Sequence, residues 1–150
     1  MKPKAASPGA LLAILLLALA PMPAARASAA ADEYALKAAF LFNFTRFVEW
    51  PADVFPGADG SFRICVFGTD PFGTRLDALT RRRVGTRPIE VTRPSALSDL
   101  ARCQIAYLGT GTPEAIEAAA TGNAAPATLT VASDAGFARD GGIVALVTAG

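Results

Sequence analysis

The stretch Phe62–Gly68, which reads FRICVFG, decides the fold of this chain. An almost unbroken apolar run that ends at a glycine is typical of a strand buried in a sheet. Downstream, short apolar runs alternate with helical segments, which predicts an α/β domain, Rossmann-like or flavodoxin-like, whose mostly parallel sheet carries helices on both faces. Strands are predicted at 88–92, 103–108, 127–132 and 142–147, and helices at about 71–82, 95–102 and 113–120.

A long apolar N-terminal helix is predicted before this strand, over Asp32–Glu49. Apolar residues recur there at helical spacing, and Trp50-Pro51 ends the pattern. Few positions are polar, so most of the helix circumference must be covered. The cover is either the sheet of the same domain or a partner protein.

The start of the chain has the layout of a secretory signal peptide. Lys2 and Lys4 precede the apolar run 11–20, and small residues follow it. The run is shorter than the roughly 20 residues that span a bilayer. We therefore predict that residues 1–31 are a signal peptide, cleaved between about 27 and 31, and that the protein acts in the periplasm.

The predicted mature chain, residues 32–150, has the size of a single domain. It keeps 11 basic and 13 acidic side chains, a net charge of −2, which gives no reason to expect nucleic acid as a partner. The one local charge run, Arg81–Arg83, is interpreted as the basic last turn of a helix or as an anion or lipid site. The chain contains no histidine, which excludes histidine-dependent hydrolase triads, and no metal or cofactor motif is present.

The two cysteines, Cys65 and Cys103, lie in predicted strands and are 38 positions apart. In an oxidising compartment an even count of two favours a disulfide. Two buried thiols and a redox-active cysteine are the alternatives, the last without support from a C-x-x-C motif.

Two further segments are candidates for contacts with a partner or a ligand. The loop Gly68–Gly73 follows the first strand, and its Asp70-Pro71 pair resembles the cap and first position of a helix. This loop is either a plain turn or a ligand site at the strand ends. Trp50, the only tryptophan, is either a lid on the core or an interface anchor. The candidate residues are Phe47, Glu49, Trp50, Asp70 and Phe72.

These segments in combination resemble the YfiR family. The similarity lies in Ala38–Phe44, Phe47–Pro51, Ile64–Gly68 and Asp70–Gly73, and later segments at 103–108, 128–132 and 136–143 also fit. The resemblance implies a periplasmic, non-enzymatic protein with a Rossmann-like domain. It further implies a repressor that binds the periplasmic domain of an inner-membrane diguanylate cyclase or a related sensor, and that an outer-membrane lipoprotein can sequester.

The chain departs from the family pattern at its end. Family members usually continue with another strand and a closing helix, so we expect that this chain is truncated at its C-terminus. The sheet edge at 143–147 would then be open, which makes a homodimer possible. The alternative function is a periplasmic small-molecule-binding module with its ligand near Gly68–Gly73 and the end of the first helix. An enzyme has the least support, because no catalytic constellation is present.

Overall fold

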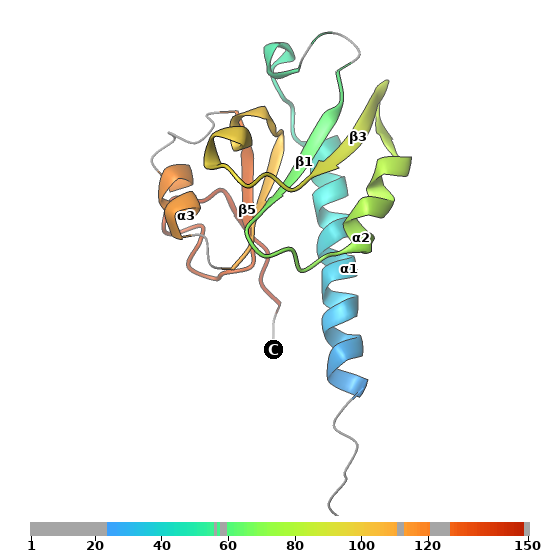
Figure 1. Cartoon of the computed structure of the whole chain (residues 1–150), viewed down its shortest axis with the longest axis vertical. Helices are drawn as coiled ribbons and strands as arrows, with labels where there is room; N and C mark the ends of the chain where they lie inside the picture. The colour runs from blue at the N-terminus through green and yellow to red at the C-terminus, as the bar shows by residue number, and fades with distance from the viewer. Residues whose placement is uncertain (1–23, 56, 58–59, 111–112, 121–126, 149–150) are drawn as a thin grey trace, which may run out of the picture.

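A six-stranded sheet forms the centre of the domain in the computed structural model, which describes residues 24–55, 57, 60–110, 113–120 and 127–148 (Figure 1). The spatial order of the strands is β2-β3-β1-β4-β5-β6, and every neighbouring pair is parallel except β2 with β3. The five parallel strands, counted in chain order, thus lie in the order 2-1-3-4-5, which flavodoxin-like sheets share. The strands are β1 (Phe62–Phe67), β2 (Arg83–Val84), β3 (Arg87–Thr92), β4 (Ile105–Leu108), β5 (Leu129–Ala132) and β6 (Val144–Ala145).

The sheet is packed on both faces. Ile64 and Val66 of β1 point into a core shared with the long helix α1 and the short helix α2, whereas Cys65 between them joins a second core with the 3-10 helix η3 and helix α3. Figure 1 shows α3 on the opposite side of the sheet from α1 and α2. The prediction of a mostly parallel sheet with helices on both faces is therefore confirmed. The helices are α1 (Ala24–Phe47), η1 (Ala52–Val54), α2 (Thr74–Asp77), η2 (Ala78–Arg81), η3 (Leu97–Arg102) and α3 (Pro113–Ala120).

Helix α1 begins before the predicted Asp32 and ends at Phe47, two residues before the predicted end, and it is not the apolar helix that was predicted. Lys37 and Thr45 occupy buried positions, 5 % and 3 % exposed, beside the fully buried Leu41. On the outer side, Leu36 is 56 % and Phe47 79 % exposed. The helix therefore docks on the sheet through one narrow face and leaves an apolar stripe in solvent. No helix within the described part of the chain is long and apolar enough to cross a membrane.

The segment between β1 and β3 also differs from the prediction. Gly73 has a φ of +54°, a left-handed conformation, so the helix begins only at Thr74 and changes to the 3-10 form at Ala78. Arg83 is not in a helical last turn, because it pairs with Pro88 as the first residue of β2. A two-residue turn with Gly85 at a φ of +59° joins β2 to β3. Such turns require positive φ, which glycine supplies.

Candidate binding surfaces at the two ends of the sheet

The candidate residues identified from the sequence lie at opposite ends of the sheet. Helix α1 runs antiparallel to the strands: Tyr34, in the middle of the helix, contacts Phe72 beyond the carboxyl end of β1, with 5.5 Å between ring centroids. Trp50, just after its end, contacts Phe62, the first residue of β1, with 4.9 Å between centroids. The expectation of one ligand site near both Gly68–Gly73 and the end of the first helix is therefore wrong.

Trp50 closes the core at the amino end of the strands. Its ring meets Phe62 edge-on, and its Nε1 donates a hydrogen bond of 3.2 Å to the carbonyl oxygen of Gln104. Both ends of this amphipathic side chain are thus used within the domain. The geometry favours a core lid over an interface anchor.

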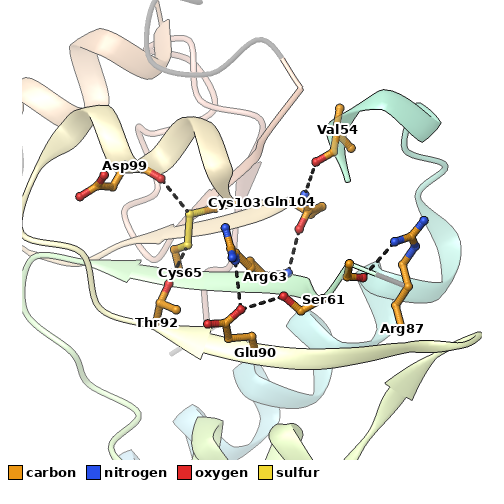
Figure 2. A network of polar contacts seen from close by, with 11 residues as sticks. Val54, Ser61, Arg63, Cys65, Arg87, Glu90, Thr92, Asp99, Cys103 and Gln104 are labelled. Carbon is orange, nitrogen blue, oxygen red and sulfur yellow. Dashed lines mark hydrogen bonds and ion pairs between the residues drawn. A yellow bond between two sulfur atoms is a disulfide. The ribbon is translucent and has the colours of Figure 1, made fainter. Parts of the chain in front are cut away.

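Gln104 fixes this end of the molecule, and the sequence analysis did not single it out. Its side chain is buried, its Oε1 accepts a 2.7 Å hydrogen bond from the Arg63 amide, and its Nε2 donates one of 3.0 Å to the Val54 carbonyl (Figure 2). A buried amide has to be paired in this way, because an unpaired one is costly. Gln104 therefore ties η1 to β1 and β4. A glutamine directly after a strand cysteine was the only sequence signal.

An open groove of about 270 Å³ lies beside Trp50. Ile143, which lines it, is 57 % exposed, and Phe47, the residue before the lining residue Val48, is 79 % exposed. Glu49 is also exposed. A contiguous patch of exposed apolar side chains can mark a protein contact site. The groove is lined by Val48, Glu49, Trp50, Pro51, Ala127, Thr128, Leu129 and Ile143.

Asp70 and Phe72, at the carboxyl end, are used inside the domain. Asp70 does not cap a helix; its Oδ1 accepts hydrogen bonds from the amides of Phe72 (2.7 Å) and Gly73 (3.3 Å) in a turn. Its Oδ2 pairs with Arg93 Nε at 2.7 Å. Partial burial opposes ionisation, but Arg93 and the two amides outweigh it and lower the pKa of Asp70. Phe72 is 0 % exposed, packed between Tyr34 and Tyr107, so it cannot meet a partner in this conformation.

A cavity of about 340 Å³ opens at the same carboxyl end, between the ends of β4 and β5 and helix α3. Its polar wall is formed by Tyr107, whose hydroxyl lies 2.7 Å from that of Ser133. Behind this wall, Lys37 donates to Ser133 at 2.8 Å and pairs with Glu33. Burial raises the pKa of Tyr107, and the hydrogen bond from Lys37 lowers the pKa of Glu33. Most of the remaining lining is apolar, from Pro71, Leu108, Pro113, Ile116 and Ala132.

A disulfide joins Cys65 to Cys103, the pairing that the sequence analysis favoured. The neighbouring strands β1 and β4 bring the two Cα atoms to 6.0 Å, within the usual range for a bridge. Both cysteines are buried, and the Thr92 hydroxyl donates to Cys65 Sγ at 3.1 Å (Figure 2). The bridge therefore joins the centre of β1 to the residue two positions before β4.

A polar groove of about 310 Å³ lies over the disulfide. Glu90 accepts hydrogen bonds from Ser61 at 2.7 Å and from Arg63 Nε at 3.0 Å (Figure 2). Both contacts lower the pKa of Glu90, and the hydrogen bond from Ser61 has the larger effect. In the part of the chain that the structure covers, no three His, Cys, Asp or Glu side chains are grouped as they would be to bind a metal.

Comparison with known protein families identifies the family of this chain. The sequence profile described as YfiR/HmsC-like matches residues 34–150, which include all of the sheet and most of α1. No curated protein matches the chain. Because the match extends over more than half of the sequence, the chain belongs to the YfiR/HmsC-like family.

Proposed function

We propose that this protein is an exported, non-catalytic regulator that represses cyclic di-GMP signalling. It would bind the periplasmic domain of an inner-membrane diguanylate cyclase or of a related sensor, and an outer-membrane lipoprotein could compete for it. Membership of the YfiR/HmsC-like family over residues 34–150 is the observation that carries the proposal. The Cys65–Cys103 disulfide supports it, since such bonds persist in oxidising compartments such as the periplasm.

Repression of this kind requires only binding. A protein that binds one conformation of its partner more tightly than another shifts the equilibrium between them by that difference in affinity. The surface we assign to this contact is the groove at the amino end of the strands, with Phe47 and Ile143 beside it. These side chains are large, apolar and exposed, the combination found at the centre of protein interfaces.

Deletion of the gene should raise cellular cyclic di-GMP, and the purified protein should bind the periplasmic domain of its cyclase in calorimetry. Phe47→Ser should weaken that binding at least tenfold, because it removes an exposed aromatic anchor. Leu36→Ser is the matched control, since Leu36 is also exposed on α1 but lies more than two turns away from the groove. Unchanged cyclic di-GMP together with no binding would contradict the regulator.

The cavity at the carboxyl end favours a second candidate function, the binding of a small molecule. Its apolar walls and the hydroxyl groups of Tyr107 and Ser133 suit a compact apolar molecule with one hydrogen-bonding group. Phenol is a suitable probe, and its binding should shift NMR signals of cavity residues in a saturable way. Ile116→Phe, which fills the cavity from α3, should abolish these shifts. Equal shifts in the variant would place the probe elsewhere.

A further inference from the structure

Four exposed arginines form what we call the basic face: Arg46 of α1 and Arg81, Arg82 and Arg83 at the junction of η2 and β2. None of them forms an ion pair with a carboxylate among the described residues. Among the described residues, the only side-chain hydrogen bond of the group is made by Arg83, whose Nη2 donates to the carbonyl oxygen of Thr86. The charges of the basic face are therefore available to a partner.

The tertiary structure, not the sequence run alone, assembles this face. The Arg82 guanidinium lies 5.6 Å from the centre of the Phe42 ring, which brings the β2–β3 hairpin against α1. Arg46 follows Phe42 by one helical turn, so a fourth positive charge joins the three consecutive ones. Asp77, the acidic residue nearest in sequence to the three, is held by Arg93 at 2.9 Å.

The basic face lies away from the acidic residues of α3, whereas Glu49 is three residues from Arg46 and Asp77 four residues from Arg81. Glu114 and Glu117 belong to α3, which Figure 1 shows on the other side of the sheet from α2. The predicted mature chain has a net charge of −2, so the local positive charge is an asymmetry and not an average property. A charge distribution of this kind orients a protein in front of an anionic surface.

The shape of the face indicates the class of partner. The arginines line none of the cavities described above, and their side chains stand exposed around a hairpin at the sheet edge. A small anion is usually bound in a concave site with a few fixed polar groups. A lipid surface needs neither, since headgroups adapt to an array of like charges and each arginine near an anionic membrane contributes about 1 kcal/mol.

We propose that the basic face docks on the anionic phospholipid headgroups of a membrane surface. The proposal goes beyond the regulator function and shares with it only the export of the chain. Docking would confine the protein to the layer in which a membrane-anchored partner presents its periplasmic domain, and would raise their encounter rate.

Co-sedimentation with vesicles tests this docking, using the protein recovered from the periplasmic fraction. At low salt it should partition onto phosphatidylcholine vesicles that contain one third phosphatidylglycerol, and much less onto pure phosphatidylcholine. Partitioning should fall steeply towards about 0.15 M salt, where charges are screened beyond about 8 Å. Absence of binding to the anionic vesicles at low salt, or equal binding to both vesicle types, would overturn the proposal.

The variant Arg81→Gln, Arg82→Gln, Arg83→Gln should partition roughly 100-fold more weakly, about fivefold for each arginine. Arg102→Gln with Arg139→Gln is the control, because both residues are exposed outside the basic face. Circular dichroism checks that all three proteins fold. Equal partitioning of the triple variant and the wild type would overturn the proposal. It would also be overturned if the wild type does not bind vesicles and the triple variant loses cyclase binding, because the basic face would then bind an acidic protein. No cyclase is needed for the vesicle assay, so its failure leaves the regulator function untouched.

Discussion

At the scale of single residues, Asp70 and Gln104 show how polar side chains hold the two ends of the sheet. Asp70 organises the turn after β1 through two backbone amides and Arg93. Gln104 joins three segments through its two amide atoms. The side chains of both residues make their contacts within the domain, so both act by keeping the binding surfaces in place.

Asp70→Asn should lower the free energy of unfolding by about 1 kcal/mol at pH 7. The substitution keeps the oxygen that accepts from the turn amides and removes the charge paired with Arg93, which is itself 39 % exposed. Because the folded-state pKa of Asp70 lies below its unfolded value of about 3.9, this stability is present above pH 4 and is lost as the pH falls through the folded pKa. Urea unfolding at pH 7 and about pH 3 measures the difference.

Asp134→Asn is the control for that measurement. Asp134 accepts a similar turn hydrogen bond, from the Gly136 amide at 2.7 Å, but forms no ion pair among the described residues. It should cost less than Asp70→Asn at pH 7. A gap between wild type and Asp70→Asn that stays the same at both pH values would contradict the role assigned to the ion pair.

Gln104→Met should destabilise the domain by roughly 2 to 3 kcal/mol, since it preserves the volume but leaves the Arg63 amide and the Val54 carbonyl without their partner. The fluorescence of Trp50, the only tryptophan, reports unfolding of this end directly. Thr80→Val, which removes an exposed hydroxyl contact, provides the comparison and should change stability little. Similar unfolding midpoints for the two variants would show that Gln104 is not a structural hub.

At the scale of secondary-structure elements, α1 and the disulfide decide how the domain is held together. Helix α1 docks through the face that carries Ala38 and Leu41 and presents Leu36 and Phe47 to solvent. The disulfide lies on the other face of the sheet, in the core shared with η3 and α3. Both faces are therefore stabilised by apolar packing, and the second also carries a covalent bond.

Leu41→Ala should cost roughly 2 to 5 kcal/mol, because Leu41 is 0 % exposed and its truncation leaves a cavity between α1 and the sheet. Leu36→Ala on the same helix should cost less than about 1 kcal/mol, since Leu36 is more than half exposed. Denaturant midpoints of the two variants give the comparison. Equal costs would mean that α1 does not dock through the face seen here.

Replacement of both cysteines by alanine should lower stability by about 2 to 4 kcal/mol, the usual range for a bridge that closes a loop of this length. In wild-type protein isolated without reductant and then unfolded, an alkylating reagent should modify neither Cys65 nor Cys103. After reduction it should modify both, as mass spectrometry would record. Alkylation of both residues before reduction would show that the bridge is absent.

At the scale of the whole molecule, the three surfaces occupy different parts of the domain, although Arg46 of the basic face directly precedes Phe47 in the chain. The groove beside Phe47 lies at the amino end of the strands, the cavity beside Tyr107 at the carboxyl end, and the basic face at the β2 edge. Partner binding, ligand binding and membrane docking can therefore be removed one at a time. Phe47→Ser, Ile116→Phe and the triple arginine variant each change one of these surfaces.

Export is the prediction that concerns the whole chain. Most of the predicted signal peptide, residues 1–23, lies outside the described residues, and cleavage between 27 and 31 would fall within the first turns of α1. Residues 28–30 are exposed, so this cleavage would remove no buried side chain that the structure describes. Intact-mass measurement on periplasmic material should show a mature start between Ser28 and Asp32. A periplasmic protein that retains Met1 would contradict the prediction.

The sequence by itself determined the elements with strong local patterns. Strand β1 and helix α3 were predicted with their observed bounds, because turn-forming residues mark where each pattern begins and ends. The even count of two cysteines in a predicted oxidising compartment also favoured their pairing. The family resemblance depended on the same local segments.

Only the tertiary structure decided what each face and end of the sheet carries. The antiparallel course of α1 separates Trp50 from Asp70 by the length of the strands, and no local pattern encodes that direction. Phe72 and Phe47 are chemically alike, yet one is buried and the other exposed, because burial depends on contacts between residues distant in sequence. For the same reason Arg46 and Arg82 lie on one face only after α1 and the β2–β3 hairpin have packed together.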